Sequence, residues 1–371
     1  MYDFDKPFMF HIELTDKCNA RCVQCPRNII EEGELKENPK LHKVEITLNQ
    51  YKSIFKNYQK KTNRVSFSGN MGDPVFAKDI FDITDYTITN VLGDDGKFCN
   101  NTNGGLRSKE WWSEYGKLLK GKKKHLVNFA IDGLEDTHHL YRVNTRYERV
   151  IENAKAFIEA GGRAGWSFIR FGHNQHQEEE VRARAKKFGF KNFNAINTQR
   201  FGNLEKINYK FKGKKYTISR YNPKNEKPQV LSTLDVTKKN WGGKHINSMT
   251  ADEINIRIQK SVDNFTKSDD TMMQYAGSIQ CYTQKRNEVY IDCLGHVHPC
   301  CWISSSTEEN LGNLHQRDYK KAWNFDFQDI LQEDYFEHIL PLSWEVKPCL
   351  TCVTSCGKDK FITVKQINKV S

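Results

Sequence analysis

Three cysteines near the N-terminus, spaced C-x3-C-x2-C at Cys18, Cys22 and Cys25, constrain this chain more than any other feature. They directly follow residues 8–14, an alternating apolar run rich in β-forming residues, which predicts a strand that opens into the cysteine loop. Three thiolates this close together suit one soft metal centre, so iron–sulfur or zinc is favoured over hard cations. Structural zinc requires a fourth ligand, and none is obvious nearby. The loop therefore predicts a cluster with one iron left open.

The loop also carries the flanking pairs Cys-Asn and Cys-Pro-Arg, and as a whole it resembles the signature of the radical S-adenosylmethionine (radical SAM) enzymes. That resemblance implies that Cys18, Cys22 and Cys25 hold a 4Fe–4S cluster. Its open iron would chelate the amino and carboxylate groups of S-adenosylmethionine (SAM), and Gln24, inside the loop, would contribute to the SAM site. The implied fold is α/β, a partial (β/α)6 TIM-like barrel.

Composition limits the class of protein. A chain of 371 residues with 37% apolar and 28% charged residues is long enough for two domains and typical of a soluble globular protein. No apolar run reaches the roughly 18 residues of a membrane span, and there is no signal peptide, so we expect a cytoplasmic protein without a membrane partner. Eleven cysteines in a reducing compartment indicate metal ligation. Besides the first three and Cys99, they all lie between Cys281 and Cys356.

Glycine-bearing loops follow the next two predicted strands. Residues 64–74 resemble the family's second strand with its Gly-Gly-Glu-Pro motif, and Gly72 and Asp73 match two of its positions, with Asp in place of Glu. Residues 96–105 resemble the third strand, which ends in Thr-Asn-Gly at Asn103. The resemblance implies that Gly72, Asp73 and Asn103 belong to the SAM site. Considered alone, both segments are also ordinary turns after a strand.

A fourth unit covers residues 125–133 and resembles the family segment Ser-x-Asp-Gly, with Ala130 where serine is common. The resemblance implies that Asp132 bonds the ribose hydroxyls of SAM and that Arg142 pairs with its carboxylate through the planar guanidinium. Two alternatives remain open. Asp132 can instead form a turn with Gly133, and Arg142 can form a surface salt bridge.

The remaining pattern predicts a parallel sheet with right-handed crossovers. Further strands are predicted at 165–171 and 192–196, and helices at 47–55 with Thr47 as N-cap, at 77–91, through 150–158 and up to residue 187. Six strands then alternate with helices or loops, and every motif above falls at the C-terminal end of a strand. In barrels of this kind the ligand binds at that end.

The C-terminal cysteines form a second group. Cys281 precedes a hairpin predicted around residues 292–295, then come Gly-x4-Cys at Cys300 and a C-x2-C pair at Cys349 and Cys352. This order resembles the SPASM and twitch extensions of radical SAM enzymes, which implies that Cys281, Cys300, Cys349 and Cys352 hold an auxiliary 4Fe–4S cluster. Three further cysteines are surplus, and any of them can substitute for a ligand: Cys293, Cys301 and Cys356. Structural zinc is the rival for this group.

The predicted domains are the barrel at 1–200, a linker or lid with a basic hairpin at 201–274, the auxiliary domain at 275–360 and a tail at 361–371. Within the linker, residues 240–270 look like loop or lid. The barrel begins almost at the first residue, which counts mildly against leader-dependent peptide modification.

By resemblance, the chain is an oxidoreductase that cleaves SAM reductively and removes a hydrogen atom from an unidentified peptide, protein side chain or small molecule. An electron donor such as flavodoxin or ferredoxin is implied, and the auxiliary cluster would transfer electrons or bind substrate. The alternative is a nucleic-acid-binding protein with structural zinc at both cysteine groups. A net charge of +11 and interleaved lysines and tyrosines at 206–221 suit that alternative, although an exposed basic hairpin is the commoner explanation.

Overall fold

The structure is a computed structural model of the 371-residue chain. It describes residues 2–56, 58, 60–198, 200–201, 204–222, 279–305, 319–333, 335–336, 340–341, 344, 349, 351–352 and 356. The lid predicted at 240–270 lies outside these residues. Within them, no helix has both the length and the apolar character needed to cross a membrane.

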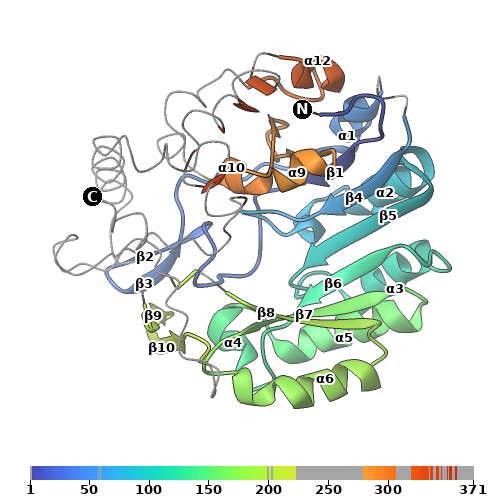
Figure 1. The fold of residues 1–371 in the computed structure, drawn as a ribbon. Helices are drawn as coiled ribbons and strands as arrows, with labels where there is room; N and C mark the ends of the chain where they lie inside the picture. The colour runs from blue at the N-terminus through green and yellow to red at the C-terminus, as the bar shows by residue number, and fades with distance from the viewer. Residues whose placement is uncertain are drawn as a thin grey trace, which may run out of the picture.

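An eight-stranded sheet forms the body of the molecule (Figure 1). In spatial order its strands are β12 (Val297–His298), β11 (Glu288–Ile291), β1 (Met9–Ile12), β4 (Thr62–Phe67), β5 (Leu92–Thr102), β6 (Leu126–Ala130), β7 (Ala164–Arg170) and β8 (Asn192–Asn197). From β11 to β8 every neighbouring pair is parallel, and β12 is antiparallel to β11. The predicted α/β partial barrel is confirmed.

Helices and short turns connect the strands. They are α1 (Leu48–Phe55), α2 (Ile80–Tyr86), α3 (Lys109–Leu118), α4 (His138–Tyr141), α5 (Tyr147–Glu159), α6 (Glu178–Lys187), α9 (Tyr282–Lys285), α10 (Cys301–Ser305), α12 (Phe327–Leu331), the 3₁₀ turns η1 (Pro74–Phe76) and η3 (Gln175–Gln177), and the π-helical turn η2 (Thr87–Val91). Thr47 caps α1 in a capping box with Gln50, as its position before the amphipathic run predicts. The helix predicted at 77–91 begins later, at Ile80, because Pro74 first starts a 3₁₀ turn.

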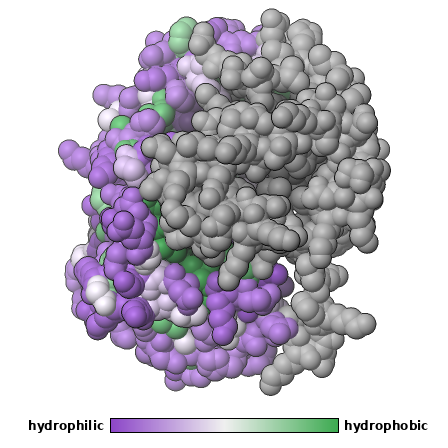
Figure 2. All heavy atoms as spheres, turned by 90° about the vertical axis from the view of Figure 1, so that its left-hand side faces the viewer, coloured by the Kyte–Doolittle hydropathy of each residue, from purple (hydrophilic) through white to green (hydrophobic). Residues whose placement is uncertain are grey.

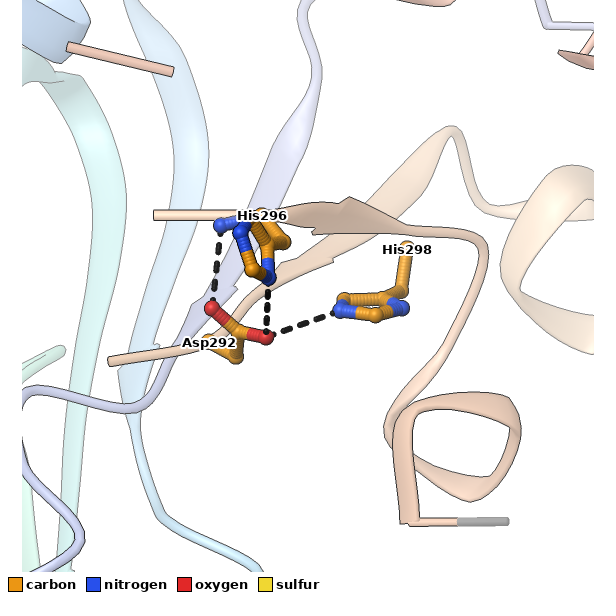
Figure 3. Close-up of side chains that lie close together, drawn as sticks. All are labelled: Asp292, His296 and His298. Atoms are coloured by element: carbon orange, nitrogen blue, oxygen red, sulfur yellow. Dashed lines mark hydrogen bonds and ion pairs between the residues drawn. The ribbon is translucent and has the colours of Figure 1, made fainter. Parts of the chain in front are cut away.

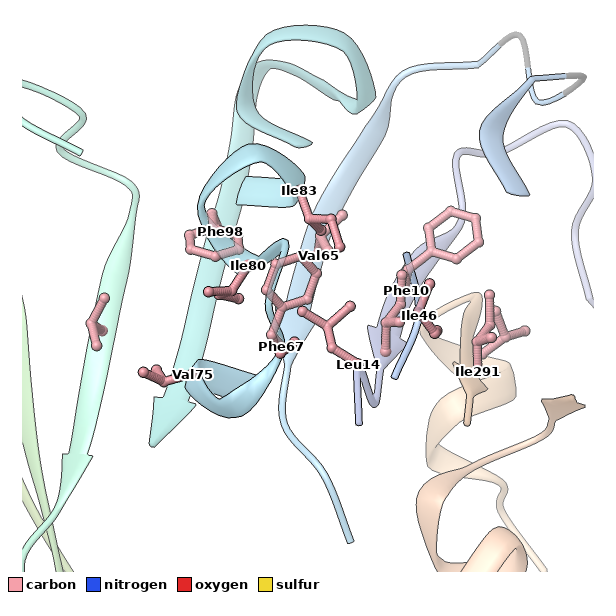
Figure 4. Close-up of a cluster of buried hydrophobic side chains, with 14 of the residues drawn as sticks. Phe10, Leu14, Ile46, Val65, Phe67, Val75, Ile80, Ile83, Phe98 and Ile291 are labelled. Carbon is pink, nitrogen blue, oxygen red and sulfur yellow. The ribbon is translucent and has the colours of Figure 1, made fainter. Parts of the chain in front are cut away.

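The main core lies between the sheet and its helices. Val65 of β4 and Phe98 of β5 lie beside Ile80 and Ile83 of α2 (Figure 4), whereas Phe10 of β1 packs against Phe55 of α1, with 5.0 Å between ring centroids. Phe10, Val65, Phe98, Ile80 and Ile83 are all buried. On β1, buried Phe10 and Ile12 alternate with Met9 and His11, which are only partly covered. This period of two is the reason that the strands can be recognised in the sequence. On the face shown in Figure 2, the described surface is largely hydrophilic, with apolar side chains mainly toward its centre.

The C-terminal hairpin is continuous with the barrel sheet. β11 pairs with β1 in parallel register from Met9↔Glu288 to Ile12↔Ile291, and Figure 1 shows α9 and α10 beside β1. The hairpin itself agrees with the prediction at 292–295, but nothing in the sequence indicates where it docks. Without a strand on the side away from β4, β1 would leave the backbone N–H and C=O groups of that edge unpaired. β11 supplies their hydrogen-bond partners.

A smaller sheet covers the cysteine loop. It comprises β10 (Lys214–Ser219), β9 (Lys206–Phe211), β3 (Glu34–Glu37) and β2 (Asn28–Glu31) in that order. The predicted basic hairpin is therefore present as β9 and β10. The β2–β3 hairpin was not predicted, although its turn residues Glu32 and Gly33 adopt positive φ angles of 49° and 80°.

The second core of the molecule lies under this smaller sheet. Ile30, Leu35 and Tyr209 pack in one buried cluster with Cys22 and Val23 of the cysteine loop. The cysteine loop is therefore enclosed by its own apolar shell.

Candidate active site and cluster cradles

The predicted SAM-site groups meet at one edge of the sheet. The cysteine loop follows β1, Asp73 follows β4, Asn103 follows β5 and Asp132 follows β6. These strands are parallel, so their C-terminal ends share an edge, as in barrel enzymes generally.

The three N-terminal thiols, which we call the first cradle, lie close together and are free. Burial, and after it the neighbouring Cys22 thiol, raises the pKa of Cys25 to about 11. Burial, Asp73 and Cys22 likewise raise the pKa of Cys18. Thiols that disfavour each other's ionisation need a cation among them to ionise together, which fits metal ligation.

Two polar donors and one carbonyl oxygen surround these sulfurs. Arg142 Nη1 donates to Cys22 Sγ at 3.5 Å, and Asn103 Nδ2 donates to Cys18 Sγ at 3.5 Å. Cys25 Sγ lies 3.7 Å from the carbonyl oxygen of Asn70. Groups of this kind orient metal ligands and tune the metal.

The loop is fixed from below by two residues that sequence reasoning missed. Arg27 donates to the Cys18 carbonyl at 3.0 Å and to Glu37 at 2.6 Å, and Asn28 donates to the Cys22 carbonyl at 3.0 Å. The only sequence signal for Arg27 and Asn28 was their position two and three residues after Cys25.

Gln24 has the surroundings expected of a ligand-binding residue. Both polar atoms of its side-chain amide are buried and have no hydrogen-bond partner among the described residues. A buried amide of this kind needs a partner, and a bound ligand would supply one.

Asp73 organises the strand ends. Its carboxylate accepts hydrogen bonds from Val75 N at 3.0 Å, Thr102 Oγ1 at 2.9 Å, Asn103 N at 2.7 Å and Asn103 Nδ2 at 2.6 Å. Burial raises its pKa. With these contacts Asp73 positions Asn103 beside Cys18, and a direct contact between Asp73 and SAM stays a prediction.

Asp132 and Arg142 form an ion pair, with 2.6 Å between Asp132 Oδ2 and Arg142 Nε. The Asp132 side chain is 0% exposed and that of Arg142 16%, so the surface salt bridge considered for Arg142 is wrong. Against burial, which lowers it, Asp132 and the Cys22 thiol hold the pKa of Arg142 well above its ordinary value. The other Asp132 oxygen accepts from Ile169 N at 2.6 Å. The ion pair therefore holds the positively charged guanidinium of Arg142 against the cysteine loop.

Glu13, which the sequence did not single out, supports the glycine loop 69–72. Its Oε1 accepts from Met71 N at 2.7 Å and from Gly72 N at 3.0 Å, and its Oε2 accepts from the Tyr290 hydroxyl. A Cβ added at Gly72 would lie 1.7 Å from the Thr15 carbonyl oxygen, so only glycine fits there.

The four cysteines predicted to bind the auxiliary cluster also gather in one place, which we call the second cradle. Cys349 and Cys352 are buried in the main core, and Cys281 and Cys300 pack against that core. A hydrogen bond with Cys349, burial and the more distant Cys300 thiol raise the pKa of Cys352. Burial, followed by Cys301 and Cys281, raises that of Cys300 to about 12.

The surplus cysteines differ in position. Burial, Glu13 and Asp16 raise the pKa of Cys293, so this thiol lies toward the first cradle. The Cys356 carbonyl accepts from Gln280 N at 3.0 Å, which places the Cys356 backbone beside that of Cys281. Cys356 therefore stays an alternative ligand.

Asp292 closes the β11–β12 hairpin (Figure 3). Its Oδ1 accepts from Leu294 N and His296 N, both at 2.9 Å. Its Oδ2 accepts from His298 Nε2 at 3.0 Å and lies 3.3 Å from His296 Nδ1. These side chains are of types that bind divalent cations, but here their contacts with one another brace the turn.

The basic hairpin offers little to nucleic-acid bases. Tyr209 is buried, its ring stacks on Tyr216 with 5.3 Å between centroids, and its hydroxyl donates to the Leu140 carbonyl at 2.6 Å. This ring is used for packing, which weighs against the nucleic-acid alternative.

A half-closed parallel barrel with a three-thiol loop at its strand ends, and a second thiol cradle on its sheet, defines an iron–sulfur protein. Family models match residues 12–187 to the radical SAM superfamily and residues 281–356 to SPASM, an iron–sulfur cluster-binding domain. The chain belongs to the radical SAM superfamily and carries a C-terminal SPASM domain. Its cofactors are accordingly SAM, the 4Fe–4S cluster that binds it and an auxiliary iron–sulfur cluster.

Solved structures share this fold. SuiB of Streptococcus suis bound to its precursor peptide SuiA has a TM-score of 0.53 and 14% identity, over 90% of this chain and 66% of SuiB. The present chain thus spans about two thirds of SuiB. The enzyme anSMEcpe with bound AdoMet has a TM-score of 0.53 and 15% identity, over 98% of this chain and 95% of that one. A search of curated protein sequences finds no match.

Proposed function

We propose that this protein is a radical SAM oxidoreductase that cleaves SAM reductively and uses the resulting radical to remove a hydrogen atom from a substrate. When bound, the 4Fe–4S cluster supplies the electron that splits SAM into methionine and the 5′-deoxyadenosyl radical. The observation that carries the proposal is the meeting of three free thiols with Arg142 and Asn103 at the strand ends.

In this proposal Cys18, Cys22 and Cys25 are the cluster ligands. Arg142 presents its guanidinium to the carboxylate of SAM, and Asp132 fixes the orientation of that guanidinium. The remaining SAM-site residues contact or position the ligand: Gln24, Gly72, Asp73 and Asn103. The barrel's contribution is orientation and the exclusion of water from the radical.

The second cradle binds the auxiliary cluster through Cys281, Cys300, Cys349 and Cys352. Four thiolates leave that cluster closed, which suits electron transfer or substrate anchoring. An external donor such as flavodoxin or ferredoxin supplies the reducing electron. Cluster-ligating thiolates need a reducing compartment, and ten of the eleven cysteines fall in the two groups spaced for metal ligation, so we place the protein in the cytoplasm.

A peptide or protein side chain is the substrate class that we favour over a small molecule. SuiB has been solved with a precursor peptide and anSMEcpe with the Cp18Cys peptide, and both share this fold. Exposing the reduced enzyme to a peptide library and sequencing the products by mass spectrometry tests this choice.

The test of the activity is anaerobic. The reconstituted protein, reduced with dithionite and given SAM, should form 5′-deoxyadenosine, measured by chromatography, and should contain about eight irons. Cys22→Ala should abolish the product. Cys99→Ala, a matched cysteine on β5, should not, and equal loss in both variants would contradict the assignment of the first cradle.

A further inference from the structure

We propose that Asn70 couples the SAM site to the second cradle, so that SAM affinity depends on an intact auxiliary-cluster site. This inference rests on the proposed function and adds a regulation of the same site. Asn70 lies in the glycine loop 69–72. On one side it contacts Cys25, which we assign to the first cradle. On the other it contacts Cys301, the neighbour of Cys300, which we assign to the second.

Asn70 contacts the first cradle and a residue directly next to the second. Its carbonyl oxygen lies 3.7 Å from Cys25 Sγ, and its side-chain Nδ2 donates to the Cys301 carbonyl at 2.8 Å. Cys301 directly follows the proposed ligand Cys300 and begins α10. A displacement of residues 300–301 is therefore passed to Asn70 through one short hydrogen bond.

A second connection runs parallel to the first. Tyr290 of β11 accepts from Asn70 Nδ2 at 3.4 Å and donates to Glu13, which in turn accepts from Met71 N and Gly72 N. Hydrogen bonds thus lead from the hairpin of the SPASM domain to the backbone at Gly72. Glu13 is only 3% exposed, so water cannot readily replace these contacts.

The glycine loop 69–72 is packed too closely against its neighbours to absorb a displacement. A Cβ at Gly69 would lie 2.4 Å from Glu13 Oε1 and 2.7 Å from the Gly72 carbonyl oxygen. A close-packed element shifts as a unit when its support moves. Loss of the second cradle therefore weakens SAM binding through this loop, and bound SAM stabilises the second cradle by the same factor.

A double-mutant cycle on the cluster-loaded enzyme tests the coupling. Asn70→Ala, Cys352→Ala and the double variant are compared with wild type by anaerobic calorimetric titration with SAM, after iron analysis confirms that the first cluster is retained. Loss of the two partly buried hydrogen bonds donated by Asn70 Nδ2, one to Cys301 and one to Tyr290, should raise the SAM Kd about fivefold to tenfold in Asn70→Ala. Cys352→Ala should raise it to a similar extent, and the double variant should bind no more weakly than either single variant.

Two controls make the outcome decisive. Asn49→Ala, on the exposed face of α1, should leave the Kd unchanged. Tyr290→Phe, which keeps the ring and removes the hydroxyl, should weaken binding about threefold to tenfold and serves if Cys352→Ala does not fold. Wild-type affinity in both Asn70→Ala and Tyr290→Phe, or single-variant effects that multiply in the double variant, would overturn the coupling. A wild-type enzyme that does not bind SAM would instead overturn the proposed function.

Discussion

Both cradles are lined by cysteine thiols, but the groups around these thiols differ between the two sites. In the first, three thiols come from one short loop, and Arg142, Asn103 and the Ala20 amide donate to their sulfurs. In the second, four thiols come from positions as far apart as Cys281 and Cys352, and their partners are neutral: the Ile303 amide donates to Cys300 Sγ at 3.5 Å, and Thr283 Oγ1 lies 3.3 Å from Cys281 Sγ. This difference suits the proposed roles, in which a charged ligand lies beside the first cradle and the second cradle encloses a cluster.

The largest expected effect separates the cradles by activity. Replacing Cys18, Cys22 and Cys25 together by Ala, or Cys349 and Cys352 together by Ala, should remove about four irons in each case. Only the first replacement should abolish 5′-deoxyadenosine formation, because the proposal assigns the SAM-binding cluster to the first cradle alone. Iron analysis and chromatography check both values. Normal SAM cleavage in the first variant would reverse the assignment.

This contrast also explains what the sequence could predict. The first cradle is local, so its spacing and its place after a strand were sufficient to predict a metal site there, and the family resemblance added SAM. The cap at Thr47 and the hairpins at 212–214 and 292–295 are likewise set by neighbouring residues. Each of these predictions depends on interactions within a few positions of the chain.

The parts that were missed are non-local. Glu13 and Tyr290 are 277 positions apart, and the parallel pairing of β11 with β1 has no local signal. The Asp132–Arg142 pair was not predicted. The two residues were considered separately, either as contacts with SAM or as a turn and a surface salt bridge, because the sequence does not show that a buried guanidinium needs a buried carboxylate. Burial decides such contacts, and burial follows from the completed fold.

The next effect tests the electrostatic character of the first cradle. Asp132→Asn leaves the Arg142 guanidinium buried without its carboxylate, which should lower the free energy of unfolding by about 3–5 kcal/mol. Glu152→Gln, at the exposed pair with Arg149, should cost at most about 1 kcal/mol. Chemical denaturation of the two variants measures the difference. Similar losses would mean that the Asp132 pair is no more important than a surface contact.

A smaller effect concerns Glu13, where the hairpin of the SPASM domain meets the glycine loop 69–72. Burial raises its pKa to about 7, above the ordinary value of 4.5. The proton is bound more tightly in the folded state, so the stability that it contributes is full below pH 4.5 and is lost as the pH rises through 7. Between pH 6 and 8 the stability of wild type relative to Glu13→Gln should fall by about 1.4 kcal/mol. A constant difference across this range, in denaturation curves at several pH values, would contradict the shift.

The smallest effect belongs to a site outside both cradles and marks the baseline for the comparison. Thr47 accepts from Gln50 N at 3.3 Å, and Gln50 Oε1 accepts from Thr47 N at 2.9 Å. Thr47→Ala should therefore lower the free energy of unfolding by about 1 kcal/mol. Since α1 packs on the outer side of the sheet, the iron content and the SAM affinity should both stay at wild-type values. A loss of SAM affinity in this variant would show that any destabilisation weakens SAM binding, and the effects at Asn70 and Tyr290 would then no longer report a specific connection between the cradles.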